Sequence, residues 1–216
     1  MRFATRQEAG QSLGRYLRKS GADADIVVGL PRGGVVVAAE VARLLQRPLE
    51  VLVVRKIGHP WHREFAVGAL AEGGVTLLDP HMAGEDKRVR AALDDVLAEE
   101  QARLQELQQK FHGGKKSGFK DRKILLVDDG LATGATAEAA VLSARAQGAR
   151  KIFVAVPVAS TSALERLMAV ADGVTALIVD PEFGAVGQYY QQFAATTDEE
   201  VLALLRRQNA QSIVSS

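Results

Sequence analysis

Apolar residues along this chain follow two alternating patterns: short continuous runs, and longer segments in which they recur every three or four residues. Continuous runs are typical of strands buried on both faces, and periodic segments are typical of helices that bury one face. The predicted strands are 26–30, 49–54, 124–127, 151–156 and 174–179. The predicted helices are 5–20, 35–45, 84–111, 135–147, 161–170 and 198–208, the last capped by Asp198. Strands that alternate with helices predict an α/β fold, a Rossmann-like parallel sheet with helices on both faces.

Two parts of the chain do not follow this alternation. Segments 65–71 and 75–78 are short and extended, and a Gly-Gly pair between them predicts a β-hairpin. Segment 84–111 carries one apolar stripe on a charged helix, which suits packing on the domain, a lid or a dimer arm. We favour packing or dimerisation over direct chemistry. No repeat or long linker divides the chain, so we expect one domain over 1–216, with an inserted helix at about 84–111 and a C-terminal appendage.

The most informative stretch is an acid pair followed by a loop of small residues. Asp128 and Asp129 follow the strand 124–127, and an alanine-rich helix follows the loop. Carboxylates only accept hydrogen bonds, so two of them at the carboxyl end of a strand suit the hydroxyl donors of a sugar diol. Small loop residues let backbone N–H groups approach an anion, and the helix N-terminus adds partial positive charge. The loop residues are Ala132, Thr133, Gly134, Ala135 and Thr136.

A simple turn is the alternative for this stretch, because Asp-Asp-Gly is good turn chemistry and Thr is an ordinary helix cap. The order strand, paired acids, small-residue loop and helix favours a site for a sugar diol beside a phosphate. The run resembles the phosphoribosyl-pyrophosphate (PRPP) binding motif of type I phosphoribosyltransferases. In that family the two acids hold the ribose 2′- and 3′-hydroxyls and the loop binds the 5′-phosphate. Gly130 departs from the motif, since the family more often has an aliphatic residue there.

A second turn follows the strand 26–30, on the same predicted edge of the sheet as the acid pair. It consists of Pro31, Arg32, Gly33 and Gly34. The glycines permit close approach of a ligand to the backbone, and the arginine adds a cation, so the turn can bind a diphosphate. A plain strand–helix turn is the alternative. Beside a PRPP-like loop, the segment resembles the pyrophosphate loop of the family.

A densely charged segment ends the predicted strand 49–54. Its Arg55 and Lys56 can neutralise phosphates across the cleft, the arginine as a fork and the lysine as a point charge. His59 and His62 suggest a metal, but no further ligands stand at suitable spacing, so surface histidines are favoured. With the residues that follow, the segment resembles a bacterial branch of predicted phosphoribosyltransferases whose members mostly lack an assigned acceptor. Those residues are Glu64, Ala66, Gly68 and Ala69.

Two further segments are candidates for closing the site. In this family a C-terminal hood covers the acceptor, which here corresponds to about 181–216. Its Phe183, Val186 and Tyr189 can contact a planar acceptor, or they can anchor the tail to the core. Lys115 and Lys116 lie in a basic loop before the acid-pair strand, where the family has a flexible loop that closes over PRPP. A solvated charge run is the alternative there.

Composition excludes several other classes of protein. Lys plus Arg is 27 and Asp plus Glu is 26, so the net charge of +1 gives no support for a nucleic-acid or membrane partner. The chain has no cysteine, which excludes disulfides, cysteine zinc sites and the nucleophile of a glutamine amidotransferase. The N-terminus lacks an apolar signal core, and no apolar run reaches the ~20 residues needed to span a bilayer. We therefore expect a cytoplasmic protein.

The resemblance implies an enzyme with the type I phosphoribosyltransferase fold. It would move the 5-phosphoribosyl group from PRPP to a nitrogenous acceptor such as a nucleobase, releasing pyrophosphate. Mg²⁺ would be held largely by oxygens of PRPP, with no dedicated protein ligand, and we expect a homodimer. In 6-oxopurine enzymes of the family an Asp before the Thr-Gly of the loop acts as a base, but here Ala132 stands there. That argues against a hypoxanthine or guanine enzyme using this base, and the pattern is closer to adenine-type loops.

Two other functions remain open at this point. A non-catalytic regulator that senses PRPP or a nucleotide can use the same fold and the same site. A phosphoribohydrolase can also keep the site and use water as the acceptor.

Overall fold

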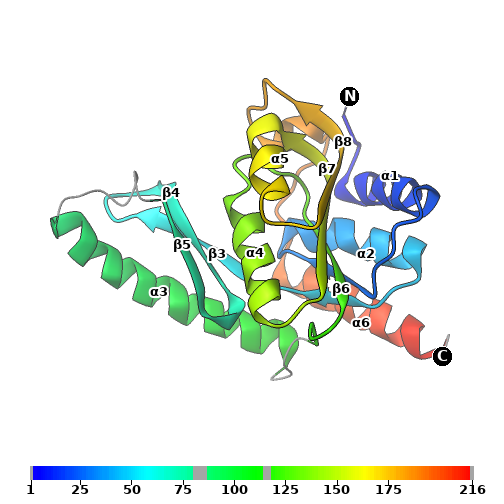
Figure 1. Cartoon of the computed structure of the whole chain (residues 1–216), viewed down its shortest axis with the longest axis horizontal. Coiled ribbons are helices and arrows are strands. Elements are labelled where there is room, and N and C mark those ends of the chain that lie inside the picture. The colour runs from blue at the N-terminus through cyan, green and yellow to red at the C-terminus, as the bar shows by residue number, and fades with distance from the viewer. Residues whose placement is uncertain (1, 80–86, 114–117, 215–216) are drawn as a thin grey trace.

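A five-stranded parallel sheet forms the centre of the molecule, with the strand order β2-β1-β6-β7-β8. The computed structural model describes residues 2–79, 87–113 and 118–214 (Figure 1), so the Lys115–Lys116 prediction lies outside the described residues. The strands of the sheet are β1 (Ile26–Gly29), β2 (Leu49–Val51), β6 (Lys123–Val127), β7 (Lys151–Ser160) and β8 (Gly173–Asp180).

Helices cover both faces of this sheet, and two separate apolar clusters fill the two interfaces. The first cluster includes residues of α1 (Arg6–Lys19), α2 (Gly33–Leu45) and α6 (Asp198–Val214). The second includes residues of α4 (Ala135–Ala146) and α5 (Thr161–Met168). Strand β6 shows how the sequence divides between them: Leu125 and Val127 join the first cluster, and Ile124 and Leu126 join the second. The predicted α/β fold with a parallel sheet is confirmed.

A second, antiparallel sheet of three strands stands beside the first, in the order β3-β4-β5. It consists of β3 (Val54–His59), β4 (His62–Ala71) and β5 (Val75–Leu78), and a short 3₁₀ turn, η1 (Glu72–Gly74), joins the last two. The hairpin prediction is therefore confirmed. Both glycines of its turn have positive φ, 74° and 79°, which a residue with a Cβ rarely adopts.

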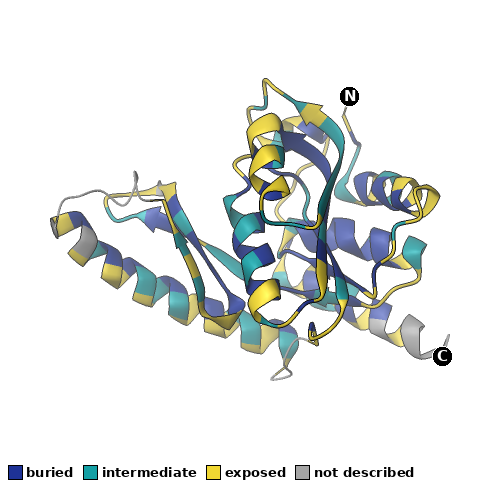
Figure 2. Cartoon of the chain, in the orientation of Figure 1, coloured by how far each residue is buried: buried dark blue, intermediate teal, exposed yellow. Residues whose placement is uncertain are grey.

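The long helix α3 (Lys87–His112) packs along this second sheet, and together they project from the central sheet as an arm (Figure 1). Buried and exposed residues alternate along the helix (Figure 2). The apolar stripe predicted from the sequence is the buried face, which includes Val89, Leu93, Val96, Leu104 and Phe111. Among the described residues, no helix is long and apolar enough to cross a bilayer.

The structure corrects the strand predicted at 49–54 and the cap predicted for the last helix. The strand predicted at 49–54 is divided, because β2 ends at Val51 and the charged segment from Val54 turns away to pair with β4. Asp198 does not cap α6, because it is already the first residue of that helix. Thr197 is the cap: its Oγ1 accepts from the N–H of Glu200 at 3.1 Å, and the Glu200 carboxylate accepts from the N–H of Thr197 at 2.7 Å.

A buried carboxylate joins the arm to the core. Glu72 accepts hydrogen bonds from the backbone N–H of Val53 and from the His112 Nε2 atom, the latter at 2.9 Å. Its backbone oxygen accepts from the Ser143 hydroxyl of α4 at 2.6 Å. Burial disfavours a charge on His112, but the hydrogen bond and the charge of Glu72, with the charge of Glu50, outweigh it and raise the pKa of His112 above 6.5.

This pair makes the stability of the protein depend on pH. Because the folded-state pKa of His112 is raised, its stabilising contribution is fully present below the unfolded value of 6.5 and is lost as pH rises through the higher folded value. We expect urea unfolding between pH 5.5 and 8.5 to show this fall in the wild type and less of it in His112→Asn. His62→Asn, an exposed histidine at the tip of the β3–β4 hairpin, is the control and should keep the wild-type profile. An identical pH profile in His112→Asn would contradict the assignment.

Candidate functional site

The acid pair and the glycine turn meet at the carboxyl edge of the central sheet. β1 and β6 are neighbours, Gly29 is paired with Val127, and both loops leave from there. The Pro31-Arg32 peptide bond is cis. A Cβ on Gly34 would lie 2.6 Å from the Asp128 Oδ1 atom, and a Cβ on Gly33 would collide with the Asp129 carboxylate. Only glycine at both positions allows the turn to approach the acids this closely, so the expected placement of the two loops on one edge is met.

An arginine that the sequence did not single out binds the second acid. The Nε of Arg6, the first residue of α1, donates to the Asp129 Oδ2 atom at 2.7 Å. Both side chains are nearly covered, with exposed fractions of 11% and 15%. Asp128 instead accepts the backbone N–H of Asp129 at 2.8 Å through its Oδ1 atom. The two carboxylates thus have different partners, although they are adjacent in sequence.

Burial dominates the electrostatics of the acid pair. It raises the pKa of Asp128 well above its usual value, and the negative charge of Asp129 raises it further. Burial also raises the pKa of Asp129, while the hydrogen bond and the charge of Arg6 oppose that shift. Lys56, on β3, lowers the pKa of both acids by its charge. The cations around the pair therefore favour its ionised form, which is the form that accepts two hydroxyl donors.

The loop after the acids ends at the N-terminus of α4. Ser160 anchors it by donating from its hydroxyl to the Ala132 oxygen at 2.6 Å. Ala132 and Thr133 are exposed, and Gly134 has a positive φ of 75° immediately before the helix begins at Ala135. The helix has no side-chain cap from Gly134, and the N–H of Ala135 makes only a long hydrogen bond of 3.5 Å with the Thr133 hydroxyl. The loop, which also includes Thr136, thus presents open backbone donors to an anion.

Both of the expected phosphate-binding arginines have carboxylate partners in this structure. Arg55 pairs with Glu100 of α3 at 2.8 Å, and Arg32 approaches Asp198 to 3.0 Å without hydrogen-bond geometry. Arg32 is half exposed, whereas Glu100 is buried and also pairs with Arg103 at 2.9 Å. The sequence placed these arginines near the cleft but could not show the acids of α3 and α6 that bind them.

The expected hood residues lie between β8 and α6, on residues 181–197, which we call the tail and which pack against the carboxyl edge. Phe183 and Tyr189 stack with centroids 5.0 Å apart, and the Tyr189 hydroxyl donates to Asp180 at 2.6 Å. Val186 lies over Gly130, where a Cβ would come within 2.8 Å of its Cγ1 atom and 2.7 Å of Val158. These contacts anchor the tail, and they give a local reason for the departure from the family pattern at position 130.

The same tail makes one contact with the acid pair and two with Arg6 that sequence reasoning missed. The Tyr190 hydroxyl donates to the backbone oxygen of Asp129 at 2.6 Å. The Arg6 guanidinium lies 3.8 Å from the centre of the Phe193 ring and donates to the Ala194 oxygen at 2.8 Å. Arg6 and Asp129 are separated by 123 positions, and no local pattern marks such a pair.

The residues in place do not form a protein site for a divalent cation. Across residues 2–79, 87–113 and 118–214, no group of three or more His, Asp or Glu side chains could hold a metal ion. One oxygen of Asp129 already accepts from Arg6. His59 and His62 stack on each other at the exposed hairpin tip, with ring centroids 5.7 Å apart.

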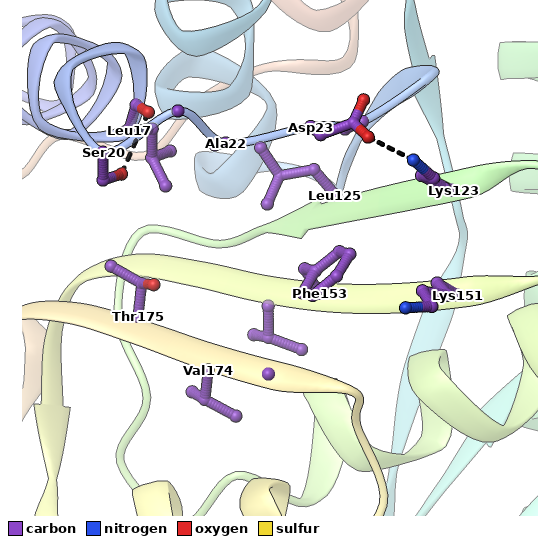
Figure 3. A pocket seen from close by; sticks show the side chains of 14 residues that line it. Leu17, Ser20, Ala22, Asp23, Lys123, Leu125, Lys151, Phe153, Val174 and Thr175 are labelled. Atoms are coloured by element: carbon purple, nitrogen blue, oxygen red, sulfur yellow. Dashed lines mark hydrogen bonds and ion pairs between the residues drawn. The ribbon is translucent and has the colours of Figure 1, made fainter.

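Cavities lie at both ends of the parallel strands. One of about 260 Å³ adjoins the glycine turn and is lined by Pro31, Arg32 and Arg55 together with Phe111 and Thr196. Another, of about 420 Å³, lies at the opposite edge, where β6, β7 and β8 begin (Figure 3). The acids and the loop of α4 belong to the carboxyl edge, so the second cavity is separate from them.

Comparison with known proteins agrees with this geometry. The family described as "Phosphoribosyl transferase domain" matches residues 6–192, which include the acid pair, the loop, the glycine turn and Arg6. The chain belongs to this family. A Mycobacterium tuberculosis protein named "Putative phosphoribosyl transferase" is 43% identical over 206 residues, which is 95% of this chain and 46% of that protein. The chain thus spans about half the length of the curated relatives it matches most extensively.

Two other comparisons extend this picture. The crystal structure of TT1426 from Thermus thermophilus is 45% identical, with a TM-score of 0.78 over 96% of this chain and 99% of that one. The amidophosphoribosyltransferase of Haemophilus influenzae is 29% identical over 157 residues, which is 71% of this chain and 25% of that protein.

Substitution of Gly130 by any residue with a side chain should destabilise the protein. A Cβ there would lie closer than 3.0 Å to both Val158 and Val186, so we expect Gly130→Ala to lower the free energy of unfolding by about 1–3 kcal/mol in urea titrations. Gly118→Ala is the matched control, because its Cβ would stand 3.7 Å from the Arg122 side chain, an ordinary contact. Equal stability of Gly130→Ala and the wild type would show that the tail does not pack on position 130.

Proposed function

We propose that this protein transfers the 5-phosphoribosyl group of PRPP to a nitrogenous acceptor and releases pyrophosphate. The observation that carries the proposal is the juxtaposition of paired carboxylates, an open helix N-terminus and a glycine turn at one sheet edge. These three features match the three parts of PRPP, namely the ribose diol, the 5′-phosphate and the pyrophosphate. Membership of the phosphoribosyl transferase family supports the same substrate.

In this proposal Asp128 and Asp129 accept hydrogen bonds from the ribose hydroxyls, and the backbone of residues 133–136 binds the 5′-phosphate. The pyrophosphate lies toward Arg32 and Gly33, with the charge of Lys56 nearby. The bond from C1 to the pyrophosphate oxygen breaks as a nitrogen of the acceptor bonds to C1. The pyrophosphate leaves with the electron pair, and the acceptor nitrogen releases its proton to the solvent. The ribose carries positive charge at that stage, as in glycoside cleavage, so the residues act by positioning and electrostatics.

The acceptor is constrained by what the loop lacks. Ala132 is exposed at the edge of the site and has a methyl group, which cannot remove a proton. We therefore propose an acceptor nitrogen that does not depend on a base at this position. Mg²⁺ would enter with PRPP, held by the oxygens of PRPP itself, and we expect the active form to be a homodimer.

A pyrophosphate-release assay tests the reaction. The protein is incubated with PRPP, Mg²⁺ and a panel of nucleobases and other nitrogenous compounds, and pyrophosphate is measured together with the ribose product. Release that requires one acceptor supports the transferase. Release without any acceptor, with free ribose 5-phosphate as the product, points to a hydrolase. Tight PRPP binding without release across the panel favours a regulator.

Replacing both acids tests the site independently of the acceptor. We expect Asp128→Asn with Asp129→Asn to weaken PRPP binding by about 100-fold or more in calorimetry, because each carboxylate loses charge-assisted hydrogen bonds of ~1.5–3 kcal/mol. Asp95→Asn, an exposed position on α3, is the control. Unchanged affinity in the double variant would refute the assignment of the acids.

A further inference from the structure

Arg6 lies at the centre of a contact between three parts of the chain that are distant in sequence. Its Nε donates to Asp129 after β6, its Nη1 donates to the Ala194 oxygen, and its guanidinium faces the ring of Phe193. The Phe193 ring in turn stacks on Tyr190 at 5.2 Å, and Tyr190 donates to the Asp129 backbone. One arginine therefore contacts both the acid pair and the tail.

The fold leaves little freedom for this side chain. A Cβ on Gly33 would lie 2.7 Å from the Arg6 Nε atom, so the glycine turn closes over the Arg6–Asp129 pair as well. The start of α1 is itself tied to the tail, because the N–H groups of Gln191 and Gln192 donate to the oxygens of Phe3 and Ala4 at 2.8 and 3.0 Å. A displaced tail would thus remove two of the partners that hold Arg6 against Asp129.

The charge of Arg6 matters because Asp129 is largely buried. The charged groups around this carboxylate are Arg6 from α1, Asp128 beside it and Lys56 from β3, and the Tyr190 hydroxyl of the tail donates to the backbone oxygen of Asp129. Asp128 disfavours a second negative charge, and the two cations favour it. A neutral carboxyl has lost acceptor capacity and donates a proton instead, so it binds a diol less well.

We propose that Arg6 is a positioning residue for the sugar donor, which holds the Asp129 carboxylate in place and couples donor binding to docking of the tail at residues 190–194. The inference rests on the proposed function, since it assumes that Asp129 binds ribose hydroxyls. Coupling of this kind is reciprocal: a docked tail strengthens donor binding, and a bound donor stabilises the docked tail to the same extent. The donor site is complete only when the tail contacts Arg6.

Calorimetry with ribose 5-phosphate and with PRPP, at pH 6 and pH 8, tests whether Arg6 positions Asp129 for donor binding. We expect Arg6→Gln to weaken binding at pH 8 by about tenfold or more, and to weaken it further at pH 6, because burial raises the pKa of Asp129 and the charge of Arg6 no longer opposes that shift. Arg6→Lys keeps the charge but loses the fork, so it should lose affinity while keeping the wild-type pH dependence. Phe193→Leu should weaken binding less than Arg6→Gln, again with the wild-type pH dependence.

Hydrogen exchange tests whether donor binding is coupled to docking of the tail. PRPP should slow exchange of the Gln191 and Gln192 amides in the wild type, and this protection should shrink in Arg6→Gln. A purely structural arginine would lower tail protection equally with and without ligand and would leave the pH dependence of binding unchanged. Urea unfolding of each variant shows whether it folds. If Arg6→Gln does not fold, Arg6→Lys is the variant used for the binding and exchange measurements.

The outcomes separate this inference from the proposed function. If the wild type binds neither PRPP nor ribose 5-phosphate, both fail. If the wild type binds and folded Arg6→Gln has the same affinity, pH profile and tail protection, the positioning role is refuted while the proposed function stands. Weaker binding with a steeper pH profile and lost ligand-dependent protection establishes the role of Arg6.

Discussion

Two adjacent carboxylates held at the end of a buried strand are the constraint on which this site depends. Burial disfavours their charge, and each disfavours the charge of the other. The positive charges of Arg6 and Lys56 favour the ionised acids, and glycines of the neighbouring turn, which have no Cβ atom, leave space for the two carboxylates. Helix packing, the glycine turn and the tail all converge on this one sheet edge. The acid pair is therefore the point that the glycine turn, the tail and Arg6 all contact.

The sequence predicts best where the physics is local. The buried strand before Asp128, the small-residue loop and the helix after it could be placed because periodicity and composition determine them within one segment. The ion-pair partners of the site residues could not be predicted, because they depend on packing between segments that are distant in sequence. Arg6 reaches Asp129 across 123 positions, and Arg55 is bound by Glu100 of a helix whose register on the second sheet no local pattern sets. The charged strand β3 was missed for the same reason, since its stability comes from pairing with β4.

The arm and the tail have different relations to the acid pair. The arm is joined to the core through Glu72 and His112, and its Arg55 forms an ion pair with Glu100 of α3. The tail contacts the pair directly through Tyr190 and, by way of Arg6, through Phe193. Among the described residues, the tail therefore contacts the acid pair directly, and the arm acts on it through the charge of Lys56. Tail residues are also the ones for which the sequence offered two equal interpretations, stacking on an acceptor or anchoring.

In the function proposed here, the acid pair and the loop of α4 together hold a ribose 5-phosphate unit. A crystal structure of the protein with ribose 5-phosphate tests it most directly. We predict that the sugar hydroxyls lie within hydrogen-bond distance of Asp128 and Asp129, and that the phosphate contacts backbone N–H groups of residues 133–136. Sugar phosphate bound at another place, for instance in the cavity at the opposite edge of the sheet, with the acids and the loop unchanged, would contradict the account.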